Sequence, residues 1–183
     1  RSRGLGDVYK RQVVHFAVSN REVWMTTKLA GKDTFFLPFN QGDDGHAGNP
    51  LNPDGGSSTA YLWERILQRD TWLEILQKFV FLKKETVEDE HGRSRRKSTL
   101  IFPRFHQWEA VTTMLAAVRE EGAGKSYLIE HSAGSGKTNT IAWTAHRLLS
   151  TYGADEQRVF DSVIVVTDRT VLDDQLQEAV RQI

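Results

Sequence analysis

Residues 131–138 have the types and the spacing that phosphate chemistry requires, and they read His-Ser-Ala-Gly-Ser-Gly-Lys-Thr. Gly134 and Gly136 can adopt backbone angles that other residues resist, which would let main-chain N–H groups converge on an anion. We expect Lys137 to contact the β- and γ-phosphates of a nucleotide and the Thr138 hydroxyl to bind Mg²⁺. The stretch therefore predicts a nucleotide-binding loop.

The elements around this loop are of the kind that a phosphate-binding loop needs. A short apolar run, 127–129, precedes it, and apolar residues at helical spacing follow it as far as Leu149. Residues 162–167 are almost continuously apolar, as in the middle of a parallel sheet, and helical spacing resumes up to Ile183. Residues 127–183 are thus predicted to be β-α-β-α.

The loop departs from the strict phosphate-binding pattern at its first position, where His131 replaces glycine. This departure favours a helicase-type variant of the loop. The alternative interpretation is a Gly-Ser loop that carries Lys-Thr by chance.

Composition indicates an ordinary soluble chain. The 183 residues include 24 basic and 24 acidic side chains, so a nucleic-acid contact would depend on local clusters of charge. The absence of cysteine excludes disulfides and thiolate metal sites. Apolar runs are far too short to cross a membrane. We therefore expect a prokaryotic cytoplasmic protein with no membrane contact.

The chain before residue 100 is predicted to be α+β. Residues 1–12 look like a translated sequencing adaptor, and the alternative is a native basic arm. Residues 13–17 and 23–28 predict a hairpin, and 40–56 predict an extended loop rich in Gly, Asn, Asp and Pro. Two short helices are expected after it, beginning near Ser57 and Asp70.

A charged stretch, 83–99, is predicted to be a linker, because acidic residues are followed there by Arg93, Arg95, Arg96 and Lys97. Its basic half could contact phosphates, or the whole stretch could be a solvated loop. A new domain is expected from residue 100, with a helix that ends at Gly122.

Several motifs occur in an order that resembles a known family. These are 102–107 (Phe-Pro-Arg-Phe-His-Gln), the loop at 131–138, and 159–169, which ends in Val-Val-Thr-Asp-Arg. Together they resemble the first RecA-like lobe of superfamily 2 helicases. More specifically, they are similar to the restriction and translocation (R) subunit of type I restriction enzymes. Three upstream blocks, 25–29, 36–40 and 61–64, are similar to the segment that joins the nuclease of that family to its motor.

The resemblance implies an α/β fold: a partial RecA-like lobe with a parallel sheet over 100–183, preceded by an α+β remnant of a nuclease domain over 13–82. It implies ATP and Mg²⁺ as cofactors. Double-stranded DNA and the modification and specificity subunits are the implied partners. It assigns nucleotide binding to Arg104, Gln107, Ser132, Ala133, Gly134, Ser135, Gly136, Lys137 and Thr138, with Gln107 reading the adenine edge. It places Thr167 and Arg169 near DNA.

No catalytic residue is assigned. The chain has no Asp-Glu-x-His or Asp-Glu-Ala-Asp motif after the loop, and no Glu-x-Lys pair with a preceding Asp after a strand. We expect the carboxylates for hydrolysis and cleavage to lie outside residues 1–183, and this chain alone to be inactive. Two alternatives remain open: another superfamily 2 DNA helicase or translocase, or a P-loop module that binds nucleotide without moving DNA.

Overall fold

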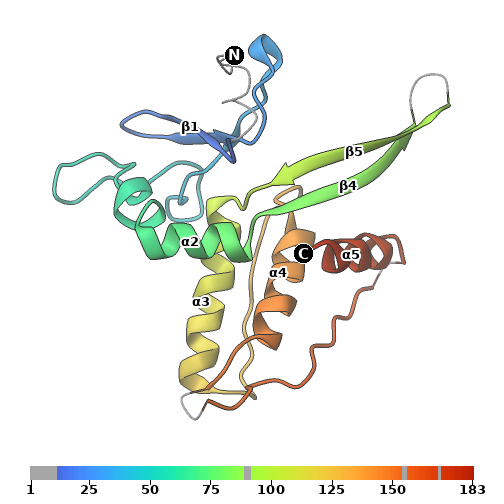
Figure 1. Cartoon of the computed structure of the whole chain (residues 1–183). Coiled ribbons are helices and arrows are strands. Elements are labelled where there is room, and N and C mark those ends of the chain that lie inside the picture. The colour runs from blue at the N-terminus through green and yellow to red at the C-terminus, as the bar shows by residue number, and fades with distance from the viewer. Residues whose placement is uncertain (1–11, 89–91, 154–155, 169) are drawn as a thin grey trace, which may run out of the picture. The chain divides into compact units, whose positions relative to one another are not determined.

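The computed structural model describes residues 12–88, 92–153, 156–168 and 170–183 (Figure 1). Residues 1–11, which include nearly all of the adaptor-like stretch, lie outside the described residues. Contacts divide the chain into two units: Arg1–Val80 with Thr99–His106, and Phe81–Ser98 with Gln107–Ile183. No described helix has the length and the apolar character that a membrane crossing requires.

The first unit is built on a three-stranded antiparallel sheet, whose strands pair in the order in which they follow along the chain. Strands β1 (His15–Val18) and β2 (Val23–Thr26) form the predicted hairpin, with Val18 opposite Val23. The turn is closed by Ser19, whose Oγ accepts hydrogen bonds from the N–H groups of Arg21 and Glu22. Strand β3 (Leu37–Pro38) pairs with β2. Val23 and Met25 are buried, because side chains two apart share one face of the strand.

Helical elements and aromatic rings complete the core of the first unit. The π-helical turn η2 (Leu62–Ile66) and the helix α2 (Arg69–Lys78) contribute buried residues to it, whereas the 3-10 turn η1 (Gly31–Asp33) has none. Phe39 packs among several rings of the aromatic cluster, with its ring centroid 5.2 Å from that of Phe16 and 5.9 Å from that of Phe105. Tyr61 packs against Phe105 at 5.1 Å. Such edge-on pairs stabilise a core beyond the area that they bury.

The predicted extended loop, 40–56, is held by its own amide side chains. Asn40 Oδ1 accepts a hydrogen bond from Val23 N at 2.8 Å. Asn49 Nδ2 donates to Asn40 Oδ1 and to the Arg21 carbonyl oxygen, and Asn49 Oδ1 accepts from Gln41 N. These bonds satisfy backbone groups that have no strand partner, so the loop is fixed to the hairpin without regular secondary structure.

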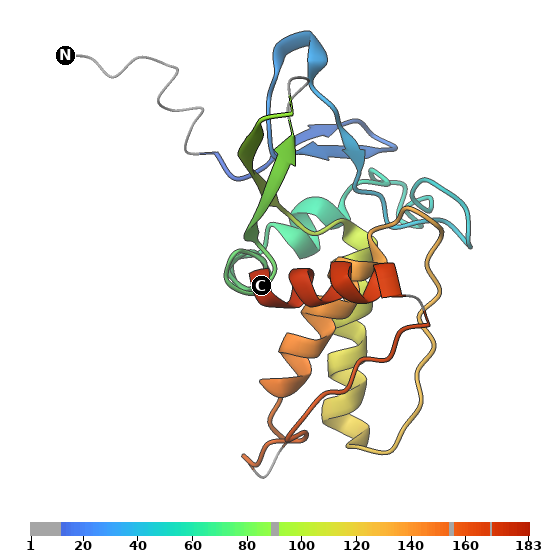
Figure 2. The same cartoon turned by 90° about the vertical axis from the view of Figure 1, so that its right-hand side faces the viewer.

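The second unit contains the helices α3 (Phe105–Glu121, with its first two residues in the first unit), α4 (Lys137–Leu149) and α5 (Thr170–Gln182). α5 packs on α4 and runs across it in Figure 2. Trp143 is fully buried in α4, and its ring lies 5.9 Å from Phe81. His146 Nε2 is hydrogen-bonded to the Val180 carbonyl oxygen at 2.7 Å. The helices predicted on either side of the loop are therefore present.

The stretch predicted as a charged linker is a β-ribbon instead. β4 (Phe81–Glu88) and β5 (Ser94–Ile101) form a two-stranded sheet, and α5 contacts β4. Side chains of β4 alternate between half-buried and exposed from Phe81 to Thr86, as expected for a strand with one covered face. The linker prediction failed because the charges hid this alternation.

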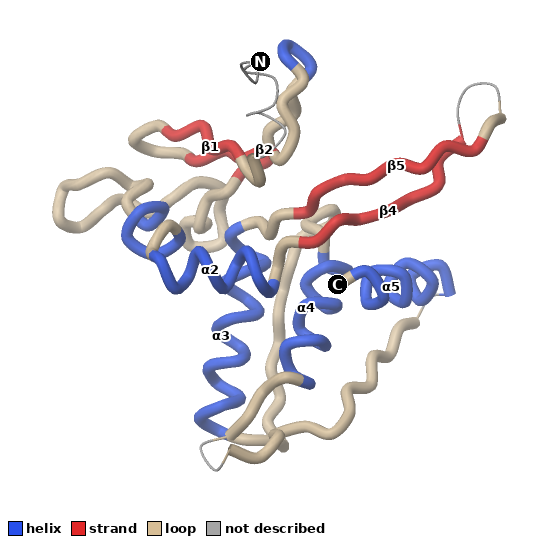
Figure 3. The backbone as a smooth tube through the Cα atoms, in the orientation of Figure 1, coloured by secondary structure: helices blue, strands red, loops and turns tan. Residues whose placement is uncertain are grey.

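Neither of the two strands predicted on either side of α4 is present. The structure assigns no strand to 127–129 or to 162–167, and both stretches are loops in Figure 3. Leu128 is 92% exposed, Ile164 85% and Val166 87%. A buried parallel strand needs neighbours that pair with its backbone and cover both faces, and the described residues do not provide them. The parallel sheet remains a prediction.

Candidate functional site

The backbone at 132–137 forms a turn that leads directly into a helix. Gly134 and Gly136 have φ values of 73° and 83°, which favour glycine. Gly136 is the N-cap residue of α4, and the Asn139 N–H donates to its carbonyl oxygen at 3.1 Å. The first N–H groups of a helix have no partners within the helix and carry its positive dipole end. The start of α4 is therefore suited to an anion.

Lys137 folds back over the loop that precedes it. Its Nζ donates to the carbonyl oxygens of His131, at 2.9 Å, and Ser132, at 3.0 Å, and the side chain is exposed. Ser135 N donates to the same Ser132 oxygen at 3.3 Å. The ammonium group is thus held at the loop by two neutral acceptors. Phosphate oxygens would bind it more strongly, because they add the attraction between opposite charges to the hydrogen bonds.

Gln107 supports the loop from the protein interior. It lies on α3, its side chain is only 4% exposed, and its Nε2 donates to the carbonyl oxygens of Ser135 (3.2 Å) and Gly136 (3.0 Å). A Cβ at Gly136 would lie 2.5 Å from that nitrogen. Glycine is therefore favoured at 136 by its backbone angle, and a larger residue would also displace the amide of Gln107.

The structure thus gives Gln107 a role that the sequence did not reveal. Its amide nitrogen donates to two carbonyl oxygens of the loop. Its contact with the adenine edge remains a prediction. One signal in the sequence could have identified this supporting role. Gln107 lies on the helix before the loop, and Gly136 is the glycine at which the next helix begins.

Arg104 belongs to the first unit, whereas the loop belongs to the second. Its Nε donates to the Pro38 carbonyl oxygen at 3.4 Å, and partial burial lowers the pKa of the guanidinium. Its predicted role in nucleotide binding remains a prediction.

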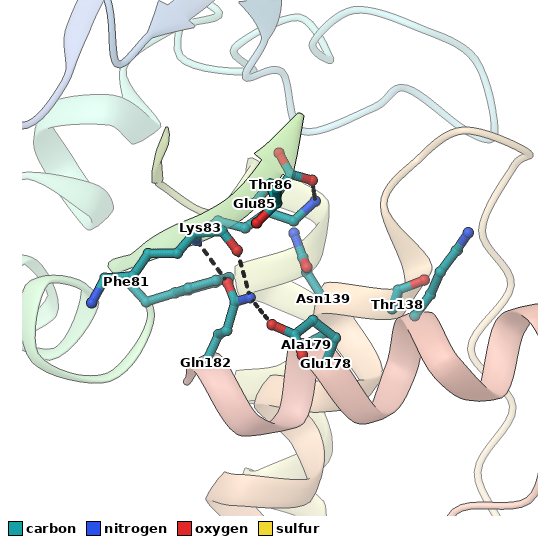
Figure 4. A pocket seen from close by; sticks show the side chains of 11 residues that line it. Phe81, Lys83, Glu85, Thr86, Thr138, Asn139, Glu178, Ala179 and Gln182 are labelled. Atoms are coloured by element: carbon teal, nitrogen blue, oxygen red, sulfur yellow. Dashed lines mark hydrogen bonds and ion pairs between the residues drawn. The ribbon is translucent and has the colours of Figure 1, made fainter. Parts of the chain in front are cut away.

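Thr138 and Asn139, at the start of α4, open onto a cavity of about 680 Å³ (Figure 4). The other walls come from β4 and α5, and the residues that line the cavity there are Phe81, Lys83, Lys84, Glu85, Thr86, Gln175, Glu178, Ala179 and Gln182. Because the three walls are far apart in sequence, no motif indicated this cavity.

The polar groups of the cavity are linked to each other. Lys83 Nζ lies 2.5 Å from Glu85 Oε1, and its hydrogen bond lowers the pKa of that carboxyl. Gln182 accepts from the Lys84 backbone N–H and donates to the Lys84 carbonyl oxygen, each at 3.0 Å, and it also donates to Glu178. The end of α5 is thereby tied to the edge of β4.

The two residues predicted to contact DNA differ in what the structure describes. Thr167 is half-buried in the loop before α5. Arg169 lies outside the described residues. Their contact with DNA remains a prediction.

The second half of the chain is similar in sequence to a known class of ATPases. Residues 106–183, which contain the loop, α4 and α5, match the SWI2/SNF2 ATPase family. The chain is also similar to a particular protein, described as the type I restriction enzyme MjaVIIP endonuclease subunit of Methanocaldococcus jannaschii. The two are 32% identical over 116 residues, which are 62% of this chain and 10% of that protein. The resemblance to type I restriction enzymes is thereby confirmed. No solved structure matches the chain.

Proposed function

We propose that this chain is the nucleotide-binding part of the R subunit of a type I restriction enzyme, a subunit that translocates DNA at the expense of ATP and cleaves it. Double-stranded DNA and the modification and specificity subunits would be its partners, and the full complex would cleave foreign unmodified DNA. The chain spans about a tenth of the length of the curated relative that it matches.

The observation that carries this proposal is the geometry of the loop at the start of α4. Two glycines with positive φ, the start of a helix and an exposed lysine meet at one point. This is the set of groups that binds the phosphates of a nucleotide. ATP fits it, because Lys137 can exchange two neutral carbonyl oxygens for phosphate oxygens. Thr138 is the residue that would bind Mg²⁺.

The extent of the similarity favours a restriction subunit over another superfamily 2 motor. The alignment with the restriction endonuclease subunit covers 116 residues, more than residues 106–183 can hold. Similarity therefore extends upstream of the ATPase match. A helicase that shared only the motor with this chain would give no reason for similarity there.

Nucleotide binding by the 183-residue chain, with and without Mg²⁺, tests the proposal. Lys137→Ala should weaken the binding of an ATP analogue about 10- to 100-fold, because it removes a charge-assisted contact with phosphate. Lys125→Ala is the matched control, since Lys125 is exposed in the same unit and lies outside the loop. Equal affinities of the two variants would contradict the site assignment.

A further inference from the structure

The ribbon of β4 and β5 carries an unbalanced set of charges along one strand. Ser94–Ser98 are all exposed, and Arg95, Arg96 and Lys97 follow one another there. β5 contains no acidic residue, whereas β4 has two lysines, Lys83 and Lys84, and two glutamates. The positive charge of the ribbon is therefore concentrated on β5.

The cations of β5 are weakly engaged by the rest of the described chain. No hydrogen bond, ion pair or ring contact with a described residue involves the side chain of Arg95 or Arg96. Lys97 acts on the Glu85 carboxyl only through its charge, and Glu85 is hydrogen-bonded to Lys83. The two guanidinium groups thus remain available to an external anion.

The positions of these cations on the ribbon indicate which kind of anion fits them. Successive side chains of a strand point to opposite faces, so Arg95 and Lys97 share one face and Arg96 lies on the other. The spacing on one face is about 6.8 Å, close to the rise of about two nucleotides along a DNA strand. The major groove of DNA admits a two-stranded ribbon and has a phosphate backbone on each side. A flat acidic protein surface would engage only one face.

We propose that the β4–β5 ribbon is a binding surface for double-stranded DNA, with Arg95, Arg96 and Lys97 contacting phosphates on both sides of a groove. This inference rests on the proposed function, which makes DNA the partner of the chain. It assigns DNA binding to a surface other than the predicted contacts of Thr167 and Arg169.

The test is the salt dependence of duplex binding by the 183-residue chain, measured by fluorescence anisotropy. The triple variant Arg95→Ala/Arg96→Ala/Lys97→Ala should raise the dissociation constant at least about tenfold at low salt. It should also reduce the slope of log affinity against log salt by about 2.7, because each phosphate contact contributes about 0.9. Arg95→Lys/Arg96→Lys should retain the slope, since it keeps the charges.

The matched control is Lys28→Ala/Lys32→Ala/Lys78→Ala, which removes three exposed charges from the first unit. An equal loss in this control would overturn the proposal, because net charge alone would then explain the effect. An unchanged slope in the ribbon variant would also overturn it. Polyglutamate is the third comparison. If the wild-type chain bound polyglutamate as tightly as duplex DNA, and the ribbon variant lost that binding, the proposal would be overturned, because the partner would then be an acidic protein.

Nucleotide binding separates this proposal from the proposed function. The ribbon variant should retain the binding of an ATP analogue, and Lys137→Ala should retain the salt slope of duplex binding. A wild-type chain that binds duplex through the ribbon but binds no nucleotide would refute the nucleotide site and leave the ribbon assignment standing. If the chain bound nucleotide but the ribbon substitutions left duplex binding unchanged, the ribbon assignment would be refuted and the nucleotide site would stand.

Discussion

The loop at 40–56 and the loop at 131–138 are both irregular backbone held by polar side chains, but they are held differently. In the first, Asn40 and Asn49 bond to backbone and to each other around the β1–β2 hairpin. In the second, Gln107 bonds from the interior, while the exposed Lys137 bonds from the solvent side. Breaking the hydrogen bonds of an exposed lysine costs little free energy, because water or a ligand can replace its partners. Moving a packed amide costs more, because it leaves buried polar groups without partners. The first loop is therefore fixed by its own amide side chains, whereas the lysine of the second loop can change its hydrogen-bond partners without leaving buried groups unpaired.

The largest expected effect is on the core next to the first loop. Phe39→Ala should lower the free energy of unfolding of the first unit by about 3–5 kcal/mol, because it removes a buried ring that contacts several others. Denaturant titration measures this change. Phe35→Ala, at a ring that is 75% exposed, is the control and should change the stability by less than about 0.5 kcal/mol. Similar losses from both substitutions would mean that the buried ring of Phe39 does not stabilise the core more than an exposed ring does.

The next effect tests how the second loop is held. Gly136→Ala should cost about 2–4 kcal/mol and weaken nucleotide binding, because it adds backbone strain and displaces Gln107 from two carbonyl oxygens. Gly124→Ala also strains a positive φ, but it meets no atom within 4 Å, so it should cost only about 1–2 kcal/mol. If the two variants were equally stable and bound nucleotide equally well, the close approach of Gln107 would have no role.

A pH effect is expected in the first unit. Burial raises the pKa of Tyr61, whose hydroxyl donates to the Phe39 carbonyl oxygen at 2.6 Å. The contribution of Tyr61 to the free energy of unfolding is therefore complete below the pKa of tyrosine in the unfolded chain, about 10. Above that pH the free energy of unfolding falls by about 1.4 kcal/mol per pH unit. In Tyr61→Phe this part of the pH dependence should disappear. Unfolding at about pH 8 and about pH 11 compares the two proteins, and identical slopes would exclude Tyr61 as the source.

The smallest effect is expected where the sequence predicted buried strands. Leu128→Ser and Val166→Thr should each change the stability of the second unit by less than about 0.5 kcal/mol, because both side chains are almost fully exposed. Thermal or denaturant unfolding measures the change. A loss of about 2 kcal/mol or more would show that these stretches are buried and would support the predicted parallel sheet.

Local signals in the sequence predicted the helices α2 to α5, the β1–β2 hairpin and the turn at 131–138. The helix expected to begin near Ser57 is present only as the π-helical turn η2 (Leu62–Ile66). Glycines at fixed spacing before a Lys-Thr pair specify a turn into a helix, and the structure has α4 beginning at Lys137. The hairpin prediction depended on the polar turn at 19–22, which the bonds of Ser19 close. Information of this kind lies within a few residues of the element that it specifies.

Features that depend on distant partners were not predictable. The apolar runs 127–129 and 162–167 resemble buried strands, but a strand exists only where another pairs with it. The β4–β5 ribbon was hidden by its charges, and the support of Gly136 by Gln107 joins residues 29 apart in the chain. The cavity beside Thr138 likewise has walls from three separate segments.

The two hydrogen bonds between Gln182 and the backbone of Lys84 also bear on self-association. A two-stranded ribbon has free edges whose N–H and C=O groups can pair with another chain. At Lys84 both groups are occupied by a single side-chain amide from the end of α5. While α5 stays in place, it shields this edge position from intermolecular strand pairing. Loss of the last turn of α5 would expose it, so fraying of this helix would promote aggregation at high protein concentration.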